Sequence, residues 1–340
     1  MDVIAERSSI TQSVQIGVET VPGTAVAAPR RLGSMGFEIG PSVDINALRP
    51  TGTKYPVLQI LGKEWAEADI NGSAVYTELP YAFSSVISAP TVTAIVDGAT
   101  PTGATRWVFN SNTYGDDAPK TLTVEQGSSF RAHRLTHGII SEYNWEWSRD
   151  EIELGGTLLG RAIEDGVTLT GSPTILPQVP VRPAELSVYI DTSSGALGTT
   201  KQLRTLKGEC NIGDRYMPLW VVDAAQPSFV GTVEGEPTVE FKITQMADTQ
   251  AAANLVAMRA GTTKFLRLRG VGPQIFAPTV GLPAGVSHQV TWDVAGQVSD
   301  ISKFEDEDGV FAVEYTFSAV HDSTWGKAFT VEVITTTSTL

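Results

Sequence analysis

The stretch Glu142-Tyr143-Asn144-Trp145-Glu146-Trp147 decides the fold class. Its aromatic residues alternate with polar ones, so the three aromatic side chains share one side of an extended chain and the polar side chains share the other. This period of two is typical of a strand with one buried and one solvated face. The same alternation recurs, between turn residues, in residues 13–18, 64–70, 105–109 and 311–317. The sequence therefore predicts a mainly β protein.

Only two segments have the pattern of a helix. Residues 248–260 combine an N-cap aspartate, an alanine-rich centre and a glycine just beyond the end. Residues 77–87 start with a threonine and an early proline, a position where proline is tolerated. Residues 173–183 hold four prolines, which exclude a helix or a central strand. We expect an extended linker there, close to the middle of the chain.

The order of predicted elements repeats on either side of this linker. Residues 13–17 (SVQIG) recur as residues 187–191 (SVYID), and a Gly-Thr loop follows each. Residues 138–142 match 296–300. The offset between matched residues falls from about 174 to about 158, which indicates an insertion in the first half around residues 91–135. We predict two related domains, residues 1–172 and 184–340, joined by a linker at 173–183.

Composition excludes several function classes. The 340 residues include 38 acidic and 24 basic side chains, a net charge of −14, which argues against holding nucleic acid by its phosphates. The single cysteine, Cys210, excludes a disulfide framework and a cysteine-based metal cluster. Charged residues reach only 18%, against a typical value of about 25%, which indicates extensive contact with other subunits. The first residues lack the pattern of a signal peptide, so we expect synthesis in a cytoplasm without membrane insertion.

Sequence motifs for catalysis are missing. We find no G-x-S-x-G elbow, no H-E-x-x-H, no phosphate-binding loop and no dinucleotide-binding glycine pattern. We therefore expect neither enzymatic activity nor a cofactor. A hydrolase that uses two carboxylates is the enzyme class that the sequence leaves open, because acidic residues are plentiful.

The opening residues 13–32, SVQIGVETVPGTAVAAPRRL, resemble the start of tail tube proteins from long, flexible-tailed bacteriophages. The shared features are a strand, Glu-Thr, a Gly-Thr-Ala-Val loop and a second strand, and the later element order also fits. The resemblance implies two tandem tail-tube-type β-sandwich domains, each with one flanking α-helix and a long loop. It also implies stacked rings, with three two-domain chains acting as a pseudo-hexamer.

For partners, the resemblance implies copies of the chain itself, a tape measure protein, a tail terminator and tail-tip proteins. The protein would be part of the virion tail and would be assembled in the cytoplasm of a bacterial host. DNA would pass through the tube without specific binding. An acidic lumen would suit this passage, because like charge keeps phosphates off the wall.

Two sets of residues are the candidate functional positions. Lumen-facing candidates are the polar residues of alternating strands: Glu142, Asn144, Glu146, Glu151, Glu153, Asp300 and Glu314. Inter-subunit candidates lie in the long loops predicted at 41–62 and 214–235: Tyr55, Leu58, Ile60, Tyr216, Met217, Leu219 and Trp220. Alternatively, the first set forms an ordinary outer surface, and the loops fold back over their own cores.

A second function class remains open at this stage, a carbohydrate-binding or adhesion β-sandwich on a virion or cell surface. Aromatic side chains exposed on one sheet face would favour sugar binding. Apolar loops on a duplicated chain favour assembly.

Overall fold

The computed structural model describes residues 12–128, 130–307 and 309–340, and it confirms a mainly β protein. The first half contains β1 (Ser13–Val18), β2 (Arg30–Leu32), β3 (Met35–Leu48), β4 (Leu58–Ser73), α1 (Leu79–Val86), β5 (Thr91–Asp97), β6 (Thr100–Asn110), β7 (Leu122–Gly127), β8 (Ala132–Trp147), β9 (Ile152–Gly160), β10 (Glu164–Val167) and β11 (Thr174–Ile175). The second half contains η2 (Pro183–Glu185), β12 (Leu186–Asp191), η3 (Ser194–Ala196), β13 (Thr205–Gly213), β14 (Tyr216–Leu219), β15 (Gly231–Glu234), β16 (Thr238–Met246), α2 (Thr249–Ala260), β17 (Lys264–Phe276), β18 (Val286–Ile301), β19 (Glu305–Glu307), β20 (Val310–Ala319) and β21 (Phe329–Thr335). Both α-helices lie where the sequence predicts them.

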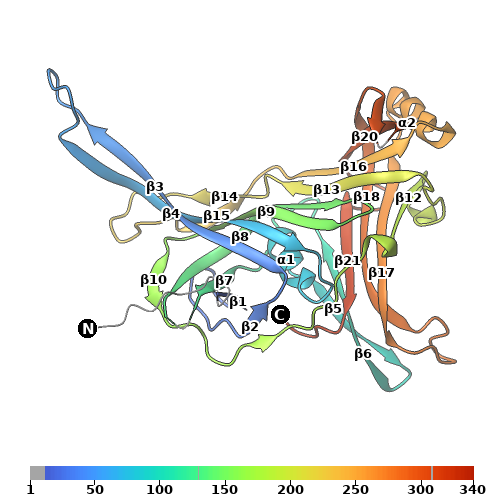
Figure 1. Cartoon of the computed structure of the whole chain (residues 1–340), viewed down its shortest axis with the longest axis horizontal. Helices are drawn as coiled ribbons and strands as arrows, with labels where there is room; N and C mark the ends of the chain where they lie inside the picture. Colours follow the sequence, from blue (N-terminus) through green and yellow to red (C-terminus); the bar gives the residue numbers. More distant parts are fainter. Residues whose placement is uncertain (1–11, 129, 308) are drawn as a thin grey trace.

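One continuous antiparallel sheet, which we call the long sheet, runs through both halves (Figure 1). Its strands pair in the order β3, β4, β9, β8, β13, β16, β20 and β18. The junction between the halves is the pair β8–β13, in which Trp145 lies opposite Cys210. The first four strands and the last four therefore lie side by side as one surface.

The pairing pattern of the first half recurs in the second. The order β3–β4–β9–β8 matches β13–β16–β20–β18, and β1–β7–β8 matches β12–β17–β18. A bulge falls between Ile140 and Glu142 in the first half and between Val298 and Asp300 in the second. At these bulges Ser141 donates to the Thr157 carbonyl at 3.3 Å, and Ser299 donates to the Thr316 carbonyl at 3.2 Å.

The Gly-Thr loops are held in the same manner in both halves. Glu19 accepts a hydrogen bond from the Gly23 amide at 2.6 Å, and Asp191 accepts one from the Gly198 amide at 2.9 Å. Threonine hydroxyls add further bonds to each carboxylate, from Thr121 at 2.8 Å to Glu19 and from Thr199 at 2.8 Å to Asp191. A buried carboxylate that accepts several bonds fixes the loop, so the Glu-Thr and Gly-Thr residues of the opening stretch have a structural role.

The insertion in the first half is a hairpin that joins the second half. Strands β5 and β6 have no counterpart among the described strands of the second half, and β6 pairs with β21 from Thr105↔Thr335 to Asn110↔Thr330. The predicted bounds of 91–135 were wrong at their end. Residues 122–127 and 132–135 belong to β7 and β8, which match β17 and β18.

The two halves also share one core and an ordered connection. A single hydrophobic cluster contains Phe83 and Trp145 of the first half together with Phe241 and Trp292 of the second. The proline-rich segment is extended, as predicted, but it is bound along the first half: the Tyr76 amide donates to the Val179 carbonyl at 3.0 Å and the Val181 amide to the Ala74 carbonyl at 2.8 Å. Residues 173–183 therefore form a strap and not a free linker.

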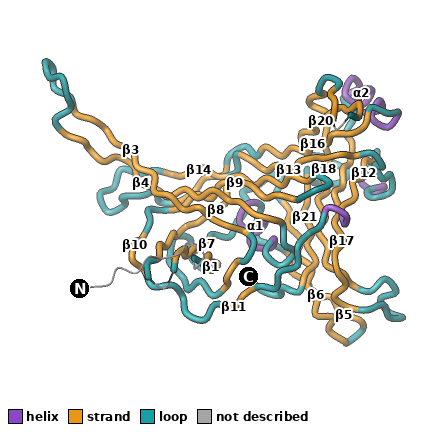
Figure 2. Tube along the Cα trace, in the orientation of Figure 1, coloured by secondary structure: helices purple, strands orange, loops and turns teal. Residues whose placement is uncertain are grey.

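A long arm projects from the body. The predicted loop at 41–62 was wrong over most of its length, because β3 and β4 continue as a paired hairpin from Leu48↔Leu58 down to Met35↔Gly72. Figure 2 shows strand colour running into the arm, with a loop only at its tip. The predicted loop at 214–235 likewise contains a short hairpin, β14–β15.

Candidate functional site

The polar side of the long sheet is the candidate site, and we call it the carboxylate face. Residues opposite one another in the ladder point to the same side, as in the row Glu38, Asp69, Thr157 and Glu142. The acidic residues on this side are Glu38, Glu67, Asp69, Glu142, Glu146, Glu153, Glu209, Glu240, Asp300, Glu305, Glu307 and Glu314, and the basic ones are Lys207 and Lys242. The face therefore carries a large excess of negative charge.

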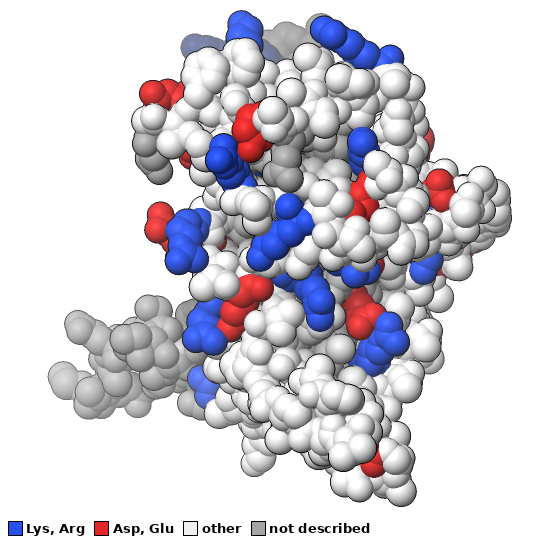
Figure 3. Space-filling view, turned by 90° about the vertical axis from the view of Figure 1, so that its right-hand side faces the viewer, with Lys and Arg blue, Asp and Glu red and all other residues white. Residues whose placement is uncertain are grey.

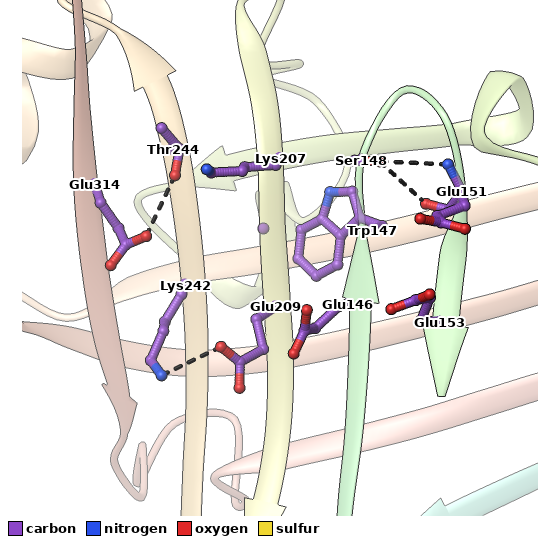
Figure 4. Close-up of a pocket in the computed structure, with 11 residues that line it drawn as sticks. Glu146, Trp147, Ser148, Glu151, Glu153, Lys207, Glu209, Lys242, Thr244 and Glu314 are labelled. Carbon is purple, nitrogen blue, oxygen red and sulfur yellow. Dashed lines mark hydrogen bonds and ion pairs between the residues drawn. The ribbon is translucent and has the colours of Figure 1, made fainter. Parts of the chain in front are cut away.

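Its centre is a shallow polar groove across the junction of the two halves. Figure 4 shows Glu146 and Glu153 on the green strands, Glu209 and Lys207 on β13, Lys242 on β16 and Glu314 on β20. Glu146 lies directly opposite both Glu153 and Glu209, so like charges sit side by side in the ladder. Such pairs destabilise a sheet when directly opposite, which indicates a purpose other than stability.

Two lysines partly neutralise this groove. The Lys242 Nζ lies 3.2 Å from a Glu209 carboxylate oxygen, and the Lys207 Nζ lies 2.8 Å from Glu307. The hydrogen bond to Glu307 raises the pKa of Lys207 above its ordinary value, so this ammonium stays charged at neutral pH. Each lysine is thereby occupied by a neighbouring carboxylate, and neither stands alone as a site for a phosphate.

Most predicted lumen-facing residues lie on this one face. Glu142, Asn144, Glu146, Glu153, Asp300 and Glu314 all take part in it, and Glu151 lies in the β8–β9 turn at the end of the groove. The prediction missed Glu38, Glu67, Asp69, Glu209, Glu240, Glu305 and Glu307. Alternation in residues 64–70 was the signal that would have found Glu67 and Asp69.

The opposite side of the long sheet is the aromatic core. Tyr143, Trp145 and Trp147 are buried there, and Trp147 packs edge-on against Phe241 with ring centroids 5.5 Å apart. Among the described ladder residues, the one aromatic on the carboxylate side is Trp65, at the base of the arm, and its ring packs edge-on against Trp220 with centroids 5.9 Å apart. The stacking platform expected of a sugar-binding sheet is therefore not on this surface.

The rest of the surface has a different charge pattern. Figure 3 shows the end of the molecule that carries β17 and α2, where lysine and arginine are interspersed with acidic side chains. On β17, for example, Arg267 forms an ion pair with Asp293 of β18 at 2.6 Å. The negative excess is thus concentrated on particular surfaces, and the carboxylate face is one of them.

The inter-subunit candidates divide into three groups. Tyr55, Leu58 and Ile60 are exposed on the arm, and Tyr55 at its tip keeps 69% of its surface accessible. Met217 and Leu219 are exposed on β14, whereas Trp220 packs against Trp65 of the arm at 5.9 Å. Tyr216 was predicted wrongly: it is buried within the chain, and its hydroxyl donates to the Ile87 carbonyl at 3.0 Å.

Beside Tyr216 lies a buried ionic cluster that joins the halves. The Arg215 side chain is fully buried and donates to the Val86 carbonyl at 3.0 Å and to the Ile87 carbonyl at 2.8 Å, at the C-terminal end of α1. Its guanidinium also pairs with Asp117 at 2.8 Å and Glu234 at 2.9 Å. A cation at a helix C-terminus complements the helix dipole, so Arg215, which lies between β13 and β14, fastens this part of the second half to α1 of the first.

Comparisons with other proteins add no family assignment. A scan against protein-family models finds no match, and neither does a search of curated proteins. Among the described residues, neither helix has the length and hydrophobicity needed to cross a bilayer.

Proposed function

We propose that this chain is a structural protein of a bacteriophage tail tube, which assembles into rings that stack into a conduit for DNA. The observation that carries the proposal is the β8–β13 pair. It joins two repeats of the same strand order side by side in one sheet, with a row of carboxylates from both repeats on one side. Repeating this step from chain to chain extends the sheet without any new kind of contact.

Both ends of the long sheet are suited to this extension. Within the described residues, β3 pairs only with β4, and the segment 297–301 of β18 pairs only with β20. Exposed strand edges are templates for pairing with another chain. A head-to-tail contact between these two edges closes into a ring if the rotation closes, and closure removes both edges.

The geometry of such a ring fits DNA. Each chain contributes eight strands, so three chains contribute twenty-four. Strands about 4.8 Å apart give a diameter of at least about 37 Å at the backbone, and side-chain layers of about 5 Å leave about 27 Å. The carboxylate face would line this channel and repel phosphates, while the aromatic core would lie outside it.

The arm supports stacking of rings. It extends beyond the body and carries exposed apolar residues along both strands, including Ile45, Leu58 and Leu61. An apolar surface of this length on a soluble chain marks an interaction site. In the proposed tube the arm contacts the neighbouring ring. The tape measure, terminator and tip proteins, and a place in the virion tail, belong to the same proposal.

Electron microscopy of the purified chain at increasing concentration tests the proposal. We expect rings and tubes with a central channel wide enough for duplex DNA. Averaged images of the rings should show three chains per ring. A carbohydrate-binding protein would instead remain monomeric and bind glycans on an array. A chain that stays monomeric at all concentrations would refute the tail-tube proposal.

A further inference from the structure

The second half carries an uncovered apolar groove between α2 and the β19–β20 hairpin. Its apolar lining includes Ala252, Leu255, Ile301, Phe304, Phe311 and Val313. The Phe304 and Phe311 rings stack on each other with centroids 4.7 Å apart, yet they remain 65% and 63% exposed. On α2, Leu255, Val256 and Met258 are exposed as well.

The matching region of the first half is completely covered. Every residue of α1 is buried, and Phe83 packs edge-on against Trp292 of the second half at 5.2 Å. The end of the β8–β9 hairpin, which matches the β19–β20 hairpin, is covered too, because Trp147 packs against Phe241. Thus each helix lies beside a hairpin. The second half of the chain covers α1 and the β8–β9 hairpin, whereas no described part of the chain covers α2 and the β19–β20 hairpin in the same way.

The covering element is fixed by the same strand pairing that joins the halves. Residues 143–147 at the end of β8 pair with residues 208–212 of β13. Alignment of the bulges at Ser141 and Ser299 places the segment 301–305 where 143–147 lies. By their pairing with β4 and β16, β3 corresponds to β13, and β3 has no second partner among the described strands.

We infer that the groove formed by α2, Phe304 and Phe311 is the docking site for the first half of a second copy of this chain, whose β3 strand pairs along residues 297–305. The second half of each chain thus binds the first half of the next chain. This contact repeats the one within the chain, where the end of β8 in the first half pairs with β13 of the second half. This inference deepens the proposed function and rests on it. It assigns this groove to the contact between neighbouring chains within a ring. The arm then makes the contacts between stacked rings.

Site-specific photo-crosslinking tests the partner. A benzoylphenylalanine placed at residue 304 should, in assembled material, form adducts with a peptide from residues 35–48 of another chain. The same probe at residue 280, where Val280 is fully exposed away from the groove, is the control and should give no such adduct. Adducts between two residue-304 regions, or only within one chain, would overturn the inference.

Substitution tests the energetic role of the groove. We expect Phe311→Ser and Phe304→Ser to raise the concentration needed for assembly at least tenfold, while Val280→Ser leaves it unchanged. Because both phenylalanines are exposed in the free chain, the thermal melting of the monomer should not fall, which separates loss of contact from loss of folding. If wild-type tubes form and the groove variants assemble equally well, the inferred docking site is refuted while the tail-tube proposal stands.

Two other results separate the inference from the proposed function. A finite oligomer without a channel, crosslinked from residue 304 to residues 35–48, would support the docking site and refute the tube. A wild-type chain that never associates would overturn both.

Discussion

Replacing Arg215 should weaken the attachment between the two halves more than replacing any exposed charge. In Arg215→Met, the side chain keeps an apolar stem but loses the guanidinium. The Asp117 carboxylate, whose side chain is fully buried, then loses its cation, and the Val86 and Ile87 carbonyls lose their donor. Removal of one partner from a buried ion pair costs about 3–5 kcal/mol.

This cost converts into a measurable melting shift. Unfolding entropy of about 2.1 cal/mol/K per residue gives about 0.7 kcal/mol/K for 340 residues that unfold together. A loss of 3–5 kcal/mol therefore lowers the Tm by about 4–7 °C. Differential scanning calorimetry of the unassembled protein measures this shift directly.

A second arginine that bridges the halves is the matched control. Arg106 of β6 pairs with Glu332 of β21, but the two side chains are 52% and 21% exposed. An exposed pair contributes less than about 1 kcal/mol, so Arg106→Met should lower the Tm by less than about 1.5 °C. Equal shifts for the two variants would refute the argument from burial. So would additive effects of Arg215→Met and Asp117→Asn, because partners in one pair must couple.

Three further predictions concern single sites. Glu146→Gln removes repulsion from Glu153 and Glu209, so it should stabilise the chain by about 0.5 kcal/mol. In assembled phage tails, the double variant Glu146→Gln with Glu209→Gln should slow DNA ejection, and unchanged ejection would refute the assignment of these residues to the lumen. Burial, reinforced by Arg161, lowers the pKa of His137 to about 4. Its unfolded value is about 6.5, so stability is lost as pH falls from 6.5 to 4, by about 2 kcal/mol at pH 5 relative to pH 7. His137→Asn, which tolerates the φ of 54°, should flatten this part of the pH–Tm curve, and an unchanged slope would contradict the assignment. In Gly208→Ala the new Cβ would lie 2.3 Å from the Trp147 ring and 2.5 Å from the Lys242 carbonyl, which costs about 1–3 kcal/mol in chemical denaturation. Gly231→Ala, with open space around it, is the control, and equal effects would contradict the clash.

The alternation of polar and apolar residues and the order of the elements predicted those features of the structure that depend on local chemistry. The period of two in residues 142–147 identified both the aromatic core and the carboxylates opposite it, because side-chain direction in a strand follows from the backbone alone. The recurrence of residues 13–17 at 187–191 likewise anticipated the repeated strand order. These inferences needed no knowledge of which strands are neighbours.

Pairing between distant segments could not be inferred in the same way. Nothing near residues 105–110 specifies that β6 pairs with β21, since a strand's partner depends on the whole topology. The segment 41–62 was predicted as a loop, whereas its residues Pro50, Gly52 and Pro56 cluster around the turn of a hairpin. The aromatic Tyr216 was assigned to a contact surface because sequence alone does not reveal the cavity beside α1 that it fills.

The β6–β21 pair also sets the order of events during synthesis. The Thr330 hydroxyl and the Phe109 carbonyl that it contacts are 221 residues apart in the chain. At about 5–20 residues per second, a ribosome needs about 11–44 s to supply the missing strand. Until then β6 presents an open edge, and until Trp292 is made α1 lacks the ring that packs on Phe83, so the nascent first half exposes surfaces that attract chaperones. Completion of the chain closes that edge, and only a finished molecule is ready to meet another.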